Sequence, residues 1–137
     1  EDVMNKLSYY NNIRRNKNLF YFGYINHPEI YLQTGDVLCL PSYREGFGSS
    51  VIEAACLGLP SICSDVYGLK DAMVDNVTGL RCKVNNIDSL YECMKHYYCN
   101  RNLIALHGKY ARERVLTHFS GDKITKYWMD FYRSILS

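Results

Sequence analysis

Two short apolar runs, separated by one helical segment, constrain the fold of this chain more than any other feature. DVLCL at 36–40 and PSICSD at 60–65 have the length and continuous apolar character of strands that are buried on both faces. Such strands occur in parallel sheets. The segment between them, at about 49–57, has helical character and stops at Gly58. The order strand, helix, strand predicts a parallel pair with a right-handed crossover.

The same alternation continues on both sides of this unit. Further strands are predicted at 19–23 and 80–84, and further helices at 2–16, 27–35, 68–76, 88–98, 102–117 and 120–136. This pattern predicts an α/β fold with helices on both faces of a parallel sheet. Four strands are fewer than the usual five or so. We therefore expect a single partial domain over 1–137, whose first strand–helix–strand portion lies upstream of Glu1.

The charge of the chain argues against one class of partner. Its net charge of +2 is too small for a nucleic-acid-binding surface. The basic clusters are short, and we interpret them as solvated helix faces or ends. One consists of Arg14, Arg15 and Lys17, and the other of Arg112 and Arg114. We therefore expect no nucleic acid among the partners of this protein.

The six cysteines give no sign of a metal site. They form no C-x-x-C pair, and no histidine falls at a zinc-like spacing from them. Cys39, Cys63 and Cys82 lie in apolar strand-like runs, where we interpret them as small buried hydrophobes in a reducing compartment. No signal peptide and no bilayer-spanning apolar run is found. We therefore expect a cytoplasmic protein without a bound metal.

The stretch PSYREGFGSSVIEAACLGLPSICSD at 41–65 carries the most informative chemistry. Gly46 and Gly48 allow the backbone to turn sharply and to approach a ligand closely. The next helix begins near Ser49 and Ser50, and the free amides at such an end bind phosphate. Alternatively, one serine only caps the helix, which is the more common case for this local pattern. Both interpretations stay open at this point.

Two carboxylates, Glu45 and Glu53, flank the glycine turn. Carboxylates that hydrolyse a glycosidic bond lie about 5 to 9.5 Å apart and face one bond. Eight residues of continuous helix rise about 12 Å, so this pair does not easily face one atom. Contacts to different parts of one elongated ligand fit the spacing better. We expect that ligand at the carboxyl edge of the sheet, where loops 23–26, 41–48 and 64–68 should meet.

Residues 41–65 resemble the signature of retaining glycosyltransferases of the family 4 type, which have the GT-B fold. Those enzymes carry a glutamate, seven residues and a second glutamate, with a glycine–aromatic–glycine turn after the first, and Glu45, 46–48 and Glu53 match. NLFYFGYI, TGDVLCLPS, GLPSICSDVYGLKDAMVDNVTGLRCKVNN and ARERVLTHFS resemble further family segments in the same order. The resemblance spans essentially the whole chain. It implies a Rossmann-like fold, the C-terminal half of a GT-B enzyme.

The resemblance also implies a role for each part of the site. Glu45 would be the catalytic-site carboxylate that holds a donor-sugar hydroxyl, and Glu53 would bind the ribose hydroxyls. The turn and the helix start would bind the sugar and the diphosphate, and an earlier loop would meet the nucleobase. The residues assigned to the sugar and diphosphate are Gly46, Phe47, Gly48, Ser49, Ser50 and Val51, and those assigned to the nucleobase are Gly23, Tyr24 and Ile25.

The implied substrate is a nucleotide-sugar, such as a UDP- or GDP-sugar, with no further cofactor and no metal. The implied acceptors are saccharides, lipids or other molecules, as in polysaccharide biosynthesis. Enzymes of this family also bind the diphosphate with an Arg and a Lys, and this sequence contains no match to those two residues. We expect them, with the N-terminal acceptor-binding domain, upstream of Glu1, and we expect the chain alone to be inactive. The alternative is a non-catalytic nucleotide- or phosphosugar-binding module.

The last predicted helix carries an aromatic stripe of Tyr127, Trp128, Phe131 and Tyr132. One interpretation is packing against this domain. The other is that the C-terminal helices, at about 101–137, pack partly toward the absent N-terminal domain, in which case the aromatic residues are exposed here and the chain self-associates. The resemblance also allows the full-length enzyme to associate peripherally with the inner face of the membrane.

Overall fold

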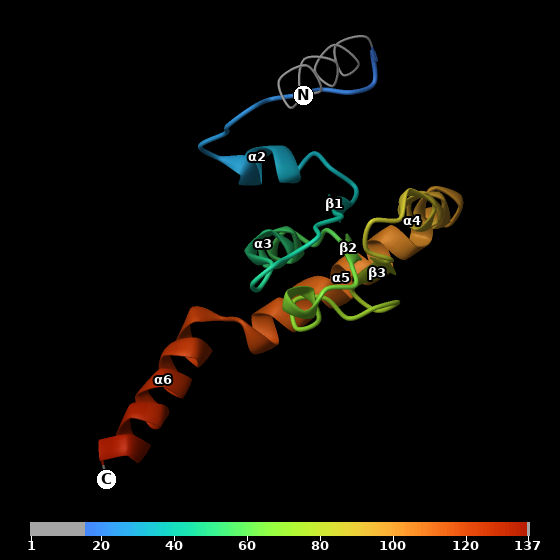
Figure 1. The fold of residues 1–137 in the computed structure, drawn as a ribbon. Helices are drawn as coiled ribbons and strands as arrows, with labels where there is room; N and C mark the ends of the chain where they lie inside the picture. Colours follow the sequence, from blue (N-terminus) through green and yellow to red (C-terminus); the bar gives the residue numbers. More distant parts are fainter. Residues whose placement is uncertain (1–15, 137) are drawn as a thin grey trace, which may run out of the picture.

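A parallel sheet lies at the centre of the protein, in a computed structural model that describes residues 16–136 (Figure 1). Its strands are β1 (Leu38–Leu40), β2 (Ser61–Ser64) and β3 (Gly79–Cys82), in the order β1-β2-β3. Leu38 pairs with Ser61 and Ser61 pairs with Gly79, so the strands begin in register. The prediction of a parallel sheet with flanking helices is confirmed.

Helices cover both faces of the sheet. The elements are α2 (Pro28–Leu32), α3 (Ser49–Cys56), the short 3₁₀ helix η1 (Tyr67–Leu69), α4 (Ile87–Cys99), α5 (Arg101–His118) and α6 (Gly121–Leu136). On one face, Cys63 packs with Val51 of α3 and Leu69 of η1. On the other face, Ile62 packs with Tyr97 of α4. Neighbouring residues of one strand point to opposite faces, so β2 is buried on both sides.

The predicted helix at 68–76 is wrong beyond its first turn. The chain forms only η1 there and continues as turns to β3. The Thr78 side chain accepts a hydrogen bond from the Val74 amide at 2.9 Å, and the Asn76 amide donates to the carbonyl of Gly79 at 2.8 Å. These bonds take backbone groups that a helix would use, which is how short polar side chains compete with helices.

The predicted strand at 19–23 is also wrong. Within the described part of the chain, the sheet contains only β1, β2 and β3, and none of them runs beside this segment. A strand without a neighbour has no hydrogen-bond ladder. Phe20 and Tyr21 are exposed, and Phe22 contacts Tyr31 of α2 with ring centroids 4.8 Å apart. The helix predicted at 2–16 falls on 1–15, outside the described residues, and on Asn16, which is not helical.

The three strand cysteines differ in burial. Cys63 and Cys82 are buried as predicted, and burial raises the pKa of the Cys63 thiol to about 12. Cys39 is exposed, so its predicted burial is wrong. Edge position does not explain the difference, because Cys82 lies on the other edge strand, β3. Cys82 packs in the core beneath Tyr97 of α4, whereas Cys39 lines an open hollow beside α4.

α6 extends away from the sheet (Figure 1) and buries none of its residues. Its aromatic stripe is exposed, and its rings contact one another, with Trp128 stacked on Tyr132 at 5.8 Å between centroids. The stripe therefore does not pack on this domain in this structure. Self-association stays a prediction. Across residues 16–136, no helix has the combination of length and apolar character needed to cross a membrane.

α4 and α5 are joined by a buried polar pair. The Tyr97 hydroxyl and Nδ1 of His107 lie 2.9 Å apart, and both side chains are buried. Burial lowers the pKa of His107, nearby His96 lowers it further, and Asp75 opposes the shift. The imidazole is therefore neutral in the folded protein at neutral pH.

We expect stability to fall in mild acid because of His107. A histidine with a lowered folded-state pKa stabilises the protein above its unfolded pKa of about 6.5, and this contribution is lost as the pH falls through the folded value. Urea unfolding between pH 7.5 and pH 5 should show a steeper loss of unfolding free energy for the wild type than for His107→Gln. Equal slopes for the two proteins would contradict this assignment.

Candidate functional site

The glycine turn leads directly into α3. Gly48 is the N-terminal flanking residue of the helix and adopts a left-handed conformation, with φ of +73°. A Cβ atom at this position would also overlap the Leu69 side chain, so only glycine fits. No side chain of the described residues caps the helix, and Ser49 and Ser50 are its first two residues. The capping interpretation of these serines therefore does not hold.

The start of α3 presents free donors. The first backbone bond of the helix runs from the Val51 amide to the carbonyl of Gly48, at 2.9 Å. Among residues 16–136, no group accepts a hydrogen bond from the amides of Ser49 and Ser50, and both residues are exposed. Val51 itself is buried in the core. The positive end of the α3 dipole is therefore open to an anion.

Glu45 is held on two sides. The Ser42 hydroxyl donates a hydrogen bond to its Oε1 atom at 2.6 Å, a charge-assisted contact between two half-buried residues. Its backbone lies against Gly68, at the start of the β2–β3 connection. A Cβ atom on Gly68 would overlap the carbonyl oxygen of Glu45 and lie 2.7 Å from that of Gly46. The carboxylate and its peptide are thus both fixed.

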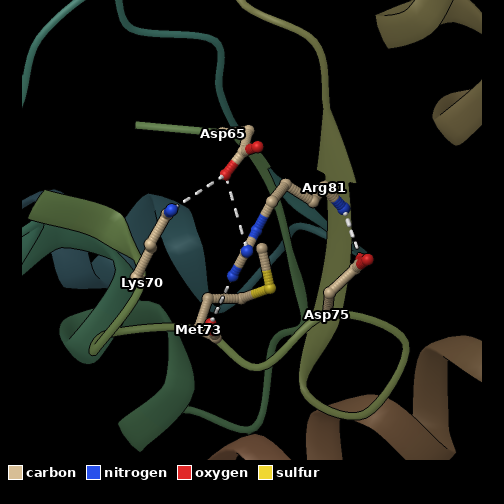
Figure 2. A network of polar contacts seen from close by, with 5 residues as sticks. All are labelled: Asp65, Lys70, Met73, Asp75 and Arg81. Carbon is tan, nitrogen blue, oxygen red and sulfur yellow. Dashed lines mark hydrogen bonds and ion pairs between the residues drawn. The ribbon is translucent and has the colours of Figure 1, made fainter. Parts of the chain in front are cut away.

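A network of charged side chains holds the β2–β3 connection (Figure 2). The Asp65 carboxylate lies between Lys70 and Arg81, with Oδ1 4.0 Å from Nζ of Lys70 and 3.5 Å from Nη1 of Arg81. Arg81 also donates through Nη2 to the carbonyl of Met73 at 3.3 Å and through its amide to Asp75 at 2.8 Å. Exposed ion pairs stabilise proteins little. The half-buried Arg81, however, contacts Asp65 near the start of this connection and Met73 and Asp75 nearer its end, and so links both parts to β3.

The loop after β1 also contacts the loop after β3. The Tyr43 hydroxyl donates to Oδ1 of Asn85 at 3.2 Å. Together with the Gly68 contact, this places the loops beyond β1, β2 and β3 at one edge of the sheet. The predicted meeting of 41–48 with 64–68 is therefore observed.

Glu53 lies in a different environment from Glu45. It lines a mostly apolar hollow of about 410 Å³ together with Ser50, Ile25 and Tyr31, whereas Glu45 is not among the lining residues. Ile25 thus lines the same hollow as Glu53. Gly23 and Tyr24 do not line the hollow, and Tyr24 is almost fully exposed.

Several residues that hold the site were missed or misjudged from the sequence. Ser42 precedes Glu45 by three residues, a spacing that could have suggested a local hydrogen bond. Gly68 and Phe119 carry no local signal, because their contacts join distant segments. Arg114 was predicted to be a solvated helix-face residue, but it is half-buried and its Nη2 atom donates to the carbonyl of Asp71 at 2.8 Å.

The site contains no recognisable metal centre. Within residues 16–136, no group of three or more His, Cys, Asp or Glu side chains is arranged to hold a metal ion. Arg44 is exposed and, within that range, makes no ion pair. The chemistry available at this edge is therefore that of a helix end, hydroxyl groups and two separate carboxylates. These groups suit a polar ligand with an anionic centre.

Comparison with known proteins identifies the class. The open parallel sheet with flanking helices matches solved GT-B glycosyltransferase structures as a partial domain. Residues 5–114 match the family model described as glycosyl transferases group 1. This match covers most of the chain, and the chain therefore belongs to that family.

Individual relatives agree with this assignment. The chain is 29% identical over 119 residues to a poly(ribitol-phosphate) alpha-N-acetylglucosaminyltransferase of Staphylococcus aureus, covering 86% of this chain and 24% of the relative. A sucrose-phosphate synthase structure from Thermosynechococcus elongatus matches with a TM-score of 0.85 at 27% identity, covering 98% of this chain and 33% of that one.

A further structure, of a TarM mutant from S. aureus in complex with Fondaparinux, alpha-GlcNAc-glycerol and UDP, matches with a TM-score of 0.80 at 29% identity. This match covers 95% of the chain and 26% of the TarM chain. The chain thus spans about a quarter to a third of the length of these relatives.

Gly68→Ala should destabilise the protein, because the added methyl group forces the Glu45–Gly46 backbone away from η1. Overpacking of this kind costs about 1 to 3 kcal/mol of unfolding free energy. Gly121→Ala is the matched control, since a Cβ atom there meets nothing within 4 Å. Urea unfolding of both variants measures the difference. Equal stability of the two variants would show that the close contact at Gly68 is not required.

Proposed function

We propose that this chain is the donor-binding domain of a retaining, family 4 type glycosyltransferase. The enzyme moves a sugar from a nucleoside-diphosphate sugar to a saccharide, lipid or other acceptor, whose site lies on an N-terminal domain. One observation carries the proposal: the uncapped start of α3, with free amides at Ser49 and Ser50, lies between two carboxylates that face different surroundings.

We assign each part of a nucleotide-sugar to one part of the site. The diphosphate binds at the start of α3, where the amides and serine hydroxyls donate hydrogen bonds. Glu45 accepts a hydrogen bond from a sugar hydroxyl, with Ser42 orienting the carboxylate. Glu53 accepts hydrogen bonds from the ribose hydroxyls, and the base binds near Ile25 in the same hollow. Gly23 and Tyr24, which precede Ile25 in the chain, meet the base from outside the hollow.

The chemistry follows from where charge develops. When the sugar leaves the donor, negative charge grows on the nucleoside diphosphate. Donors that are already aimed at this position stabilise the transition state without having to reorganise. The start of α3 supplies such donors, so we propose that transfer proceeds without a metal. Gly46, Phe47 and Gly48 bring the backbone close to the sugar and the diphosphate.

The relatives support the nucleotide-sugar part of the proposal. The TarM structure contains UDP, and the curated S. aureus relative is an N-acetylglucosaminyltransferase. Both are about 29% identical to this chain. UDP-sugars are accordingly the first donors to test, followed by GDP- and ADP-sugars. We place the enzyme in polysaccharide biosynthesis in the cytoplasm, at the inner face of the membrane.

The two glutamates should affect binding differently. Glu45→Ala should weaken binding of UDP-glucose but not of UDP, whereas Glu53→Ala should weaken both, because the first contacts only the sugar. The loss of a hydrogen bond to a charged group corresponds to an affinity loss of about tenfold or more. Titration calorimetry or NMR titration of the 137-residue chain measures these affinities.

The control for this experiment is Glu113→Ala on α5, which is exposed and paired with Lys109 at 3.8 Å. It should bind both ligands as the wild type does. If Glu45→Ala weakened UDP and UDP-glucose equally, the separation of sugar and nucleotide contacts would be wrong. If neither glutamate variant changed any affinity, the site would lie elsewhere.

The isolated chain should bind donor weakly and should not transfer sugar. It contains no match to the Arg and Lys clamp of the resembling family, and the proposed acceptor site lies on another domain. A radiolabelled UDP-sugar assay with mono- and oligosaccharide acceptors tests this expectation, with the same assay on the longer protein as the positive control. Glycosyl transfer by the 137 residues alone would overturn the proposal that the acceptor site lies on another domain.

A further inference from the structure

The last turn of α5 reaches the glycine turn of the site. The ring of Phe119, the residue that follows α5, packs edge-on against the ring of Phe47, with centroids 5.6 Å apart and planes at 66°. Phe47 is the residue between Gly46 and Gly48. Edge-to-face ring pairs of this geometry are attractive beyond the apolar area that they bury. A residue 72 positions away in sequence thus contacts the centre of the turn.

Arg114 contacts the same Phe119 ring. Its guanidinium group lies 5.6 Å from the centroid of the Phe119 ring, within the range of a cation–π interaction. Its Nη2 atom donates to the carbonyl of Asp71 at 2.8 Å. The buried Nε atom has no hydrogen-bond partner within the described residues. Arg114 therefore connects the β2–β3 connection to Phe119 through one hydrogen bond and one ring face.

The glycine turn depends on such external contacts for its shape. A Cβ atom added to Gly46 would meet nothing within 4 Å, so this side of the turn is unpacked. Two glycines also give the turn a large conformational freedom. The position of its peptide groups relative to α3 is then set by Gly68 against the Glu45–Gly46 peptide and by Gly48 against Leu69, and the contact of the Phe47 ring with Phe119 holds the residue between the two glycines.

We propose that Phe119 and Arg114 are positioning residues for the donor-binding turn. They do not touch the donor. They fix Phe47, and through it they hold the Gly46–Gly48 backbone where it meets the sugar and the diphosphate. This role rests on the proposed function. The support of the turn by Phe119 does not depend on any ligand, and it is tested separately.

The ligand-free test is amide hydrogen exchange of the 137-residue chain, because exchange reports local opening. The Val51 and Ile52 amides donate to the carbonyl of Gly48 at 2.9 and 3.4 Å and therefore report opening of the glycine turn. Phe119→Leu, which keeps apolar bulk but removes the ring, should speed exchange of these two amides about two- to tenfold, in line with the energy of one ring pair. Phe119→Tyr should restore slow exchange. The internal control is α4 at 87–99, where exchange should not change.

The second test uses binding of UDP-glucose and UDP. Phe119→Leu and Arg114→Lys should each weaken UDP-glucose binding about two- to tenfold. Arg114→Lys is informative because lysine keeps the charge but lacks the planar group that stacks on the ring. Arg112→Lys is the matched control, since Arg112 lies on the same helix and is exposed. It should bind as the wild type does.

Each outcome decides the proposal. Faster exchange of the Val51 and Ile52 amides without a change in α4, with rescue by Phe119→Tyr and weaker UDP-glucose binding, supports it. Faster exchange in α4 to the same degree would reduce Phe119 to a general stability residue and overturn the positioning role. Unchanged exchange of the Val51 and Ile52 amides would overturn it as well. If the wild type bound no nucleotide but the exchange results were as expected, the proposed function would fail while the support of the turn by Phe119 would stand.

Discussion

The arrangement of the site depends on the backbone contact between Gly68 and the Glu45–Gly46 peptide. Two loops that follow different strands approach there so closely that no side chain fits between them. Leu69, the next residue, belongs to the core formed with Val51 and Cys63, so the contact is anchored in the interior of the protein. The position of Glu45 is therefore set by core packing as well as by its own loop. Interiors are close-packed and transmit such constraints over short distances.

The charges at this edge distinguish the parts of a ligand. A carboxylate repels a phosphate, so neither Glu45 nor Glu53 is suited to hold the diphosphate. The start of α3 attracts an anion and lies between them in the chain. Carboxylates accept hydrogen bonds from hydroxyl groups well, and both ends of a nucleotide-sugar offer such hydroxyls. In the proposed function, one anion-attracting position with a carboxylate on each side of it in the chain would set the direction in which the nucleotide-sugar binds.

The sequence predicted those features whose signal is local and periodic. The buried runs that form β1 and β2, the helix at α3 and the separation of the two glutamates were all recognisable because each depends on residues close in the chain. The strand predicted at 19–23 was wrong because strand formation needs a neighbour that the pattern cannot supply. The helix predicted at 68–76 was wrong because the Thr78 side chain and the carbonyl of Gly79 accept hydrogen bonds from amides that a helix would use. Cys39 is exposed because it lines an open hollow beside α4, and the strand pattern does not show which part of a sheet a helix covers.

The contacts described above hold the glycine turn at Gly46–Gly48 through residues of the described chain. Ser42 fixes the carboxylate, Gly68 and Leu69 fix the backbone, and Phe119 fixes the ring of Phe47. In the proposed function, the turn would therefore have its donor-binding shape without contacts from another domain. Preorganisation of this kind lowers the entropy lost on binding. A second domain would then add contacts on the opposite side of the ligand, which raises affinity without being needed to form this half of the site.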